Sequence, residues 1–290
     1  TSGELRSYSD IPDVGDITPD IQKELIHGYR ACVSYVDAQI GRLLEELEKL
    51  GLADNTIVCL WVDHGWHLGD HGLWHKHTNF EQATRAPLII RSPGCLPKRT
   101  TREPTGFVDI FPTLCELTGL PIPAVLEGKS LAGLMKGQEQ GPREFILSQY
   151  PRSIDGKPVM GYTLRDRRHR YVKWLQMDFR KGVRKGLLVA TELYDYEKDP
   201  LETRSEQDNP AYADVVKRFE SHFAVLGVAQ HTGKYGQQDA AAATADGFGA
   251  PLYNGEGKFL SAGAVAVSGQ AFSSATEVKV TAKPESVSGA

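Results

Sequence analysis

The chain has 290 residues, of which 40% are hydrophobic and 24% charged, so it can bury a core in one large domain or two modest ones. This composition excludes an intrinsically disordered chain. The formal charge of -4 offers no overall positive field for nucleic acid, and no stretch approaches the roughly 18 apolar residues of a membrane span. The cysteines show no C-x-x-C spacing, which argues against a zinc knuckle or a disulfide framework.

The first residue is Thr1 rather than methionine, and the start of the chain is polar and rich in turn residues. It lacks the apolar segment of a signal peptide. We therefore expect the chain to be a piece of a longer protein, and the sequence alone leaves its localisation open.

The first strong element is a long helix. Thr18 is a good N-cap and Pro19 suits the first helical position, where its missing N–H costs nothing. Apolar residues follow at helical spacing as far as Leu50, and Gly51 has the residue type that ends helices. The pattern predicts a rod of about 45–50 Å, at about 1.5 Å per residue.

Two apolar runs and a second helix follow and predict an α/β arrangement. The run 56–62 has no alternation, which favours a strand covered on both faces, as in a parallel sheet. A second run covers 86–90. Asp109 is then predicted to cap a helix that ends at Leu120.

The composition changes near residue 143. Strands are predicted at 161–165, 170–174 and 192–196, and Asn209-Pro210 predicts the start of a helix that ends near Leu226. These elements indicate a small antiparallel sheet with a helix packed on it. We therefore predict three regions: the α/β part, the small sheet with its helix, and a low-complexity linker with an uncertain β-like tail, at 1–142, 143–227 and 228–290.

The loop DHGWHLGDHGLWHKHTNFE, residues 63–81, carries the candidate chemistry. Asp63 and His64 follow directly on an apolar strand, at an end where ligands bind in open α/β sheets. A carboxylate and an imidazole there can hold a divalent cation, and Lys76 can neutralise an oxyanion.

Plainer interpretations exist for the same loop. Asp63 is also the residue type of an ordinary turn or helix cap. His67 and His75 are predicted to be ordinary surface histidines. A zinc site from His71 and His75 is disfavoured, because a glycine lies between them and no Glu follows His71.

The stretch 34–94, which includes this loop, resembles the C-terminal half of a sulfatase of the alkaline-phosphatase superfamily, and within it the iduronate-2-sulfatase type. The resemblance covers roughly residues 20–205. After the histidine-rich loop it continues through FVDIFPTLCELTGLPIP, LEGKSL, GYTLRDRRHRYVKW and ELYDYEKDPLET. It implies a partial sulfatase-like α/β sheet with flanking helices, followed by a small C-terminal antiparallel sheet with a helix. It also suggests a secreted, periplasmic or lysosomal protein.

The resemblance implies roles for residues of the loop. Asp63 and His64 match the residues that bind the divalent metal, expected to be Ca²⁺, and Lys76 matches the lysine that contacts the sulfate. Trp74, His75 and His77 are candidates for lining the substrate pocket.

Two parts of the family pattern are missing. Sulfatases use a formylglycine, made from Cys or Ser of a C-x-P-S-R type motif, and an early Asp-Asp pair on the metal. The near-match at 95–99 has Lys98 at the Ser position and follows the metal motif, so we interpret it as a loop. We therefore expect the formylglycine in a missing N-terminal half that this chain needs as its partner. The chain alone is predicted to bind metal weakly and to be inactive.

For the intact protein the resemblance implies hydrolysis of sulfate esters, with a sulfated sugar as the substrate. The basic hairpin 165–170 is either a grip for a polyanionic glycan or a solvated turn. One alternative function is a phosphodiesterase or phosphonate hydrolase of the same superfamily. The other is a non-catalytic fragment that docks on an N-terminal partner.

Overall fold

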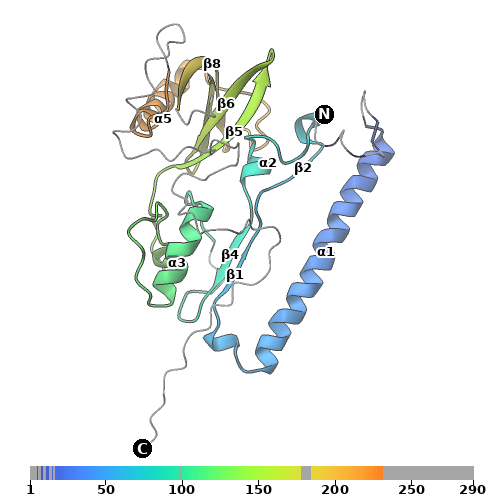
Figure 1. Ribbon diagram of the computed structural model, residues 1–290, viewed down its shortest axis with the longest axis vertical. Helices are drawn as coiled ribbons and strands as arrows, with labels where there is room; N and C mark the ends of the chain where they lie inside the picture. The colour runs from blue at the N-terminus through green and yellow to red at the C-terminus, as the bar shows by residue number, and fades with distance from the viewer. Residues whose placement is uncertain are drawn as a thin grey trace, which may run out of the picture.

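The computed structural model describes residues 5, 8, 11, 12, 15, 17–97, 100–177 and 184–230. Within them the chain forms a long helix, a two-stranded sheet, a short hairpin and a five-stranded sheet with a helix beside it (Figure 1). The predicted low-complexity linker and β-like tail lie, from residue 231 on, outside the described residues. The predicted boundaries after residues 142 and 227 stay predictions.

Helix α1 (Pro19–Lys49) begins and ends where the sequence predicts. The Thr18 hydroxyl accepts a hydrogen bond from the Ile21 amide at 3.4 Å, and Gly51 has a φ of 68°, the left-handed conformation that ends helices. Figure 1 shows α1 along one side of the molecule, and none of its residues is buried. Within the described part of the chain, no helix combines the length and apolarity needed to cross a membrane.

Strands β1 (Val58–Trp61) and β4 (Leu88–Arg91) form a two-stranded sheet from the two predicted apolar runs. The prediction of a parallel sheet covered on both faces is wrong for this pair, because the strands are antiparallel. Trp61 and Ile89 are 44% and 60% exposed. An apolar run without alternation indicates that both strand faces avoid water, but it specifies neither strand direction nor the segment that covers the faces.

The loop between β1 and β4 is built from short elements. In chain order the loop contains β2 (His67–Leu68), η3 (Asp70–Gly72), β3 (Trp74–His75) and α2 (Glu81–Thr84). A 3-10 turn, η2 (Ala53–Asn55), lies before β1. Strands β2 and β3 pair as a hairpin that places His67 opposite His75. The hairpin gives the histidine-rich loop a defined backbone.

The predicted second helix is shorter than expected. A 3-10 turn, η4 (Phe107–Asp109), leads into α3 (Ile110–Leu117), so the helix ends before the predicted Leu120. Gly119 has a φ of 71° and ends the helical backbone. A short helix, α4 (Ala132–Met135), packs against α3.

Asp109 does not cap α3, and that prediction is wrong. Its backbone already has helical dihedrals, whereas an N-cap residue needs extended ones. Its buried carboxylate instead accepts hydrogen bonds from the amides of Gly106 and Lys129, at 2.9 and 2.8 Å, and pairs with Arg143. Asp109 therefore joins three loops around the start of α3.

The second sheet contains the predicted strands and two that the sequence pattern did not reveal. Neighbouring strands are antiparallel except for the last pair, which is parallel. In sheet order they are β5 (Ile146–Ile154), β6 (Lys157–Arg165), β7 (His169–Gln176), β8 (Lys185–Asp195) and β9 (Ala229–Gln230).

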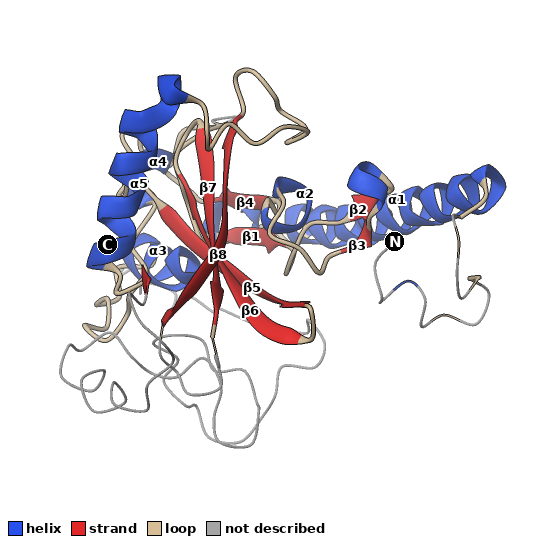
Figure 2. Cartoon of the chain, turned by 90° about the horizontal axis from the view of Figure 1, so that it is seen from above, coloured by secondary structure: helices blue, strands red, loops and turns tan. Residues whose placement is uncertain are grey.

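The main core lies between this sheet and the helix predicted after Asn209. A 3-10 turn, η6 (Pro210–Tyr212), leads into α5 (Ala213–Val225), which lies alongside the sheet (Figure 2). Phe219 and Phe223 of α5 are fully buried against Leu164 and other apolar residues of the sheet. Each such side chain contributes about 1.5–3 kcal/mol when it leaves water.

Candidate functional site

Asp63 and His64 lie side by side where the chain leaves β1. The His64 Nε2 atom is 3.3 Å from the Asp63 Oδ2 atom, and the Asp63 side chain is 85% exposed. The His64 Nδ1 atom lies 2.8 Å from the Gly65 carbonyl oxygen, which accepts a hydrogen bond from that nitrogen. The Nε2 lone pair then faces a carboxylate oxygen, so an imidazole nitrogen and a carboxylate, two groups that bind divalent cations, lie side by side.

Trp66 is the centre of the site. Its ring stacks on His64 with centroids 5.8 Å apart, contacts His75 at 4.8 Å, and lies 5.7 Å from the Lys76 ammonium. Tyr29 of α1 also stacks on this ring, with centroids 6.2 Å apart. Lys76 and His64 thus both contact the Trp66 ring, Lys76 through a cation–π interaction. The structure therefore places His64 and Lys76 against one ring, with Asp63 next to His64.

Sequence reasoning missed Trp66. The available signal was a large aromatic residue placed two positions after His64 in a polar, glycine-rich loop. Such a residue has no place in a solvated turn and indicates a packed or ligand-facing ring.

The three residues predicted to line a substrate pocket lie in different surroundings. Trp74 is 4% exposed and packs with Leu5, Ile11 and Ile17. His75 is 8% exposed and stacks on Tyr8 at 5.4 Å. His77 is exposed, and its ring stacks on Tyr150 of β5 with centroids 5.5 Å apart.

The interpretation of His67 and His75 as surface histidines is wrong. His67 is fully buried, with Nδ1 2.6 Å from the Asp70 carboxylate and Nε2 2.7 Å from the Thr78 hydroxyl. Burial lowers the pKa of His67, although the hydrogen bond to Asp70 acts in the opposite direction. Because polar rings can be buried once they have partners, residue type alone does not indicate their exposure.

The backbone of the loop is held in uncommon conformations. His71 and His75 have φ values of 57° and 68°, in the left-handed region that side chains rarely adopt. The His71 ring stacks on Phe80 at 4.2 Å. Residues in such conformations persist only where surrounding contacts hold them, and they concentrate at functional sites.

The candidate site holds part of a cation's ligand set. Among the described residues no group of three His, Cys, Asp or Glu side chains is placed to share a metal ion. Asp63 and His64 contribute two groups, whereas Ca²⁺ takes about six to eight oxygen ligands. The two donors suit a cation, and a full coordination sphere needs further ones.

The basic hairpin 165–170 differs from a fully solvated turn, because most of its arginines are ion-paired within the chain, although the Arg167 side chain is 56% exposed; its role as a grip for a glycan stays a prediction. Arg170 is 1% exposed and pairs with the buried Glu202. The other arginines of the hairpin pair with carboxylates from distant segments: Arg165 with Glu81, Arg167 with Glu103, and Arg168 with Asp195. Hydrogen bonds from Arg168 hold the pKa of Asp195 well below its ordinary value.

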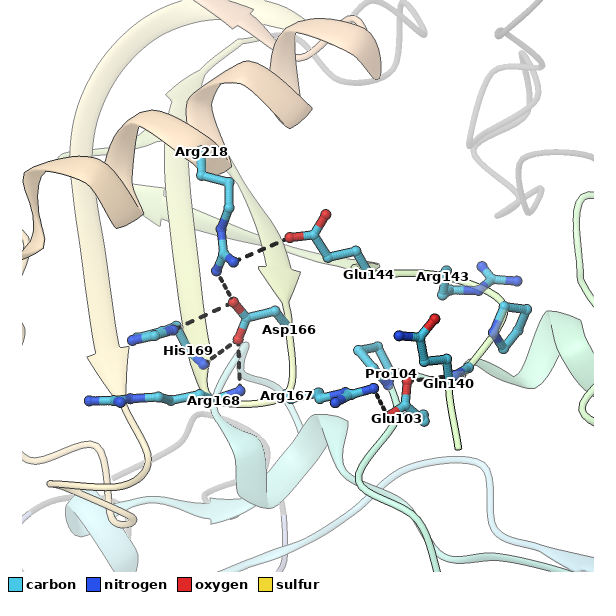
Figure 3. A pocket seen from close by; sticks show the side chains of 12 residues that line it. Glu103, Pro104, Gln140, Arg143, Glu144, Asp166, Arg167, Arg168, His169 and Arg218 are labelled. Atoms are coloured by element: carbon cyan, nitrogen blue, oxygen red, sulfur yellow. Dashed lines mark hydrogen bonds and ion pairs between the residues drawn. The ribbon is translucent and has the colours of Figure 1, made fainter. Parts of the chain in front are cut away.

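A cavity of about 650 Å³ lies beside this hairpin. Figure 3 shows that Arg218 points at Asp166 and Arg167 at Glu103, so these basic groups face carboxylates within the chain. The charges of the cavity wall are therefore used in internal ion pairs.

Two family models match the chain. Residues 7–120 match the model described as Sulfatase, and residues 69–228 match the one described as N-sulphoglucosamine sulphohydrolase, C-terminal. Iduronate 2-sulfatase of Mus musculus is 34% identical over 258 residues, an alignment that covers 69% of this chain and 46% of that protein. The chain thus spans less than half the length of this relative.

Solved structures are also similar to the fold. A putative sulfatase from Bacteroides thetaiotaomicron has a TM-score of 0.62 at 25% identity, covering 72% of this chain and 44% of that structure. A phosphonate monoester hydrolase from Silicibacter pomeroyi has a TM-score of 0.53 at 29% identity, covering 66% of this chain and 38% of that structure. These similarities confirm the predicted fold class: part of a sulfatase-like α/β fold with a C-terminal antiparallel sheet and helix.

Proposed function

The chain belongs to the sulfatase family, and from this membership we propose that the whole protein hydrolyses the sulfate ester of a sulfated sugar with the help of a divalent cation. The observation that carries the proposal is the placement of His64 and Lys76 against the Trp66 ring, with Asp63 next to His64. The sugar substrate is supported by the similarity to iduronate 2-sulfatase, a protein whose name states its sugar acid.

Each residue of the site has a distinct part in this proposal. Asp63 and His64 hold the cation, for which Ca²⁺ is our first choice, and a bound cation would supply positive charge next to the sulfate oxygens. Lys76 places its ammonium group at the same oxygens, where negative charge develops as the ester bond breaks. The Trp66 ring holds Lys76 through the cation–π contact. The exposed His77 is our candidate for contact with the sugar, and packing is the role that we assign to Trp74 and His75.

We further propose that an N-terminal half completes the site with the remaining cation ligands and the formylglycine. Two observations support this. The chain spans 46% of the length of its mouse relative. Large apolar side chains are also exposed on α1 and on the β1–β4 sheet, where a missing part of the domain can cover them. They include Val33, Val36, Leu43, Trp61 and Ile89.

The test joins this chain to the segment encoded upstream of it and measures hydrolysis of an aryl sulfate and of sulfated sugars. Asp63→Ala is expected to abolish turnover and weaken cation binding. Lys76→Ala is expected to lower kcat/KM by about 100-fold or more, the scale for loss of one charge-stabilising donor. Asp20→Ala, at an exposed carboxylate on α1, is the matched control and should change neither quantity. Retained activity in Asp63→Ala contradicts the cation assignment, and a loss below threefold in Lys76→Ala removes Lys76 from the site.

A second candidate is hydrolysis of a phosphonate or phosphate diester, which the similarity to a phosphonate monoester hydrolase favours. The Asp63–His64 pair with its cation, together with Lys76, also suits a phosphoryl group. Assaying a phosphonate monoester beside the aryl sulfate separates the two functions. A higher kcat/KM for the phosphonate overturns the sulfatase proposal and leaves the site assignment in place.

A further inference from the structure

A buried ion pair joins the five-stranded sheet to the candidate site. Arg170 of β7 and Glu202, in the turn after β8, are 1% and 2% exposed and pair with each other. The Tyr196 hydroxyl donates a second hydrogen bond to the Glu202 carboxylate at 2.5 Å. The Arg170 guanidinium also lies near the rings of Phe80 and Tyr194, 5.1 and 4.8 Å from their centroids. The pair is therefore buried among polar and aromatic groups of the chain.

Both members of the pair also bind the backbone that follows Lys76. Arg170 donates a hydrogen bond to the Asn79 carbonyl oxygen, and the Glu202 carboxylate accepts one from the Glu81 amide at 2.9 Å. Glu81 is the first residue of α2, so Glu202 supplies a negative charge at the start of this helix. Glu202 itself has a φ of 55°, an uncommon conformation that these contacts maintain.

Asn79 packs tightly against Gly161 of β6. Its Nδ2 atom donates to the Gly161 carbonyl of β6 at 3.2 Å, and a Cβ atom on Gly161 would lie 2.3 Å from that nitrogen. The segment that carries Lys76 is thus pressed against the sheet at one place and bonded to the ion pair at two others.

Helix α2 also contacts the turn that carries the Asp63–His64 pair. The Gly65 amide donates a hydrogen bond to the Ala83 carbonyl of α2 at 2.8 Å. A Cβ atom on Gly65 would lie only 1.9 Å from the Gln82 carbonyl oxygen, so the turn that carries His64 directly touches α2. Helix α2 therefore lies between the ion pair on one side and the Asp63–His64 turn on the other.

We propose that Arg170 and Glu202 are positioning residues, which set the places of Lys76 and His64 without touching substrate or cation; this role rests on the proposed function. Stability alone is a weak reason for such a pair, because replacing a buried ion pair by apolar residues is often neutral or stabilising. Its directed bonds, in contrast, fix two backbone atoms next to the site. A misplacement of about 1 Å at a catalytic group can lower a rate about 100-fold.

The first test reads positions directly, in this 290-residue chain, from the ring signals of isotope-labelled histidines in NMR spectra. Arg170→Gln is compared with Lys173→Gln, which breaks another ion pair of β7, made by the buried Lys173 with the half-buried Glu220 of α5. We expect Arg170→Gln to shift the His64 and His77 signals and Lys173→Gln to leave them unchanged. If Arg170→Gln does not fold, Tyr196→Phe, which removes one hydrogen bond to Glu202, is judged by the same signals. Unchanged His64 and His77 signals in the folded variant overturn the proposal.

The second test uses the chain joined to its N-terminal half. Arg170→Gln should lower kcat/KM for an aryl sulfate about 10- to 100-fold, mainly through kcat, whereas Lys173→Gln should change it less than threefold. Equal losses in both variants would show a merely structural role and overturn the proposal. If the unmodified joined protein has no sulfatase activity, the proposed function fails, and the histidine signals still decide the positioning role.

Discussion

Gly65 offers a sharp test of the contact between the Asp63–His64 turn and helix α2. In Gly65→Ala the new Cβ atom would lie 1.9 Å from the Gln82 carbonyl oxygen and 3.2 Å from that of Arg85. An ordinary contact needs about 3.4 Å, so the turn and α2 must separate by about 1.5 Å, and backbone atoms cannot rotate away as a side chain can. Overpacking of this kind costs about 1–3 kcal/mol, and loss of the hydrogen bond from the Gly65 amide adds about 1 kcal/mol.

We therefore expect Gly65→Ala to lower the free energy of unfolding by about 2–4 kcal/mol, measured by urea denaturation of the chain. Gly28→Ala in α1 is the matched control, because a Cβ atom there meets nothing within 4 Å. Alanine should raise helix stability at that position by up to about 1 kcal/mol. In the chain joined to its N-terminal half, Gly65→Ala should also weaken cation binding, since His64 moves with the turn. A loss below about 0.5 kcal/mol with unchanged cation affinity would refute the contact.

The remaining predictions concern the core and the pH dependence of folding. Phe219→Ala should lower the free energy of unfolding by about 3–5 kcal/mol, because Phe219 is fully buried, whereas Val225→Ala, at a 73% exposed position of the same helix, should change it by less than about 0.5 kcal/mol; similar losses in both would argue against the core. Burial lowers the pKa of His67 and His222 below the ordinary 6.5, so the unfolded chain binds protons that the folded chain resists, and stability should be lost as pH falls below about 6.5. Urea denaturation at several pH values checks this, and His67→Gln should flatten the dependence; an unchanged slope would contradict it.

Elements that depend on neighbouring residues were predictable from the sequence. The ends of α1 follow from Thr18, Pro19 and Gly51, whose local geometry needs no distant partner. The start of the C-terminal helix follows in the same way from Asn209, whose side chain accepts a hydrogen bond from the Ala211 amide. The direction of the β1–β4 pair was not predictable, because apolarity alone does not encode it.

The hairpin arginines show why the supports of the site escaped prediction. Arg165 binds Glu81 across 84 residues of sequence, and Arg170 binds the Asn79 carbonyl across 91. A cluster of basic residues looks the same in sequence whether its charges face solvent or carboxylates that folding brings in. Only the fold distinguishes a glycan-binding surface from an internal ion-pair network.

The candidate site divides in a way that bears on how it is completed. The side chains that support it are enclosed within the described residues, since His67, Arg170 and Glu202 are all buried and bonded to other side chains. Its donors are not, because the Asp63 side chain is 85% exposed beside a histidine lone pair. If Asp63 and His64 served only internal packing, contacts within this chain would bury them as they bury His67, Arg170 and Glu202. A rigid, internally braced turn with an open pair of donors is instead the arrangement expected where the other ligands approach from outside this segment, and it is why the proposal places them in an N-terminal half.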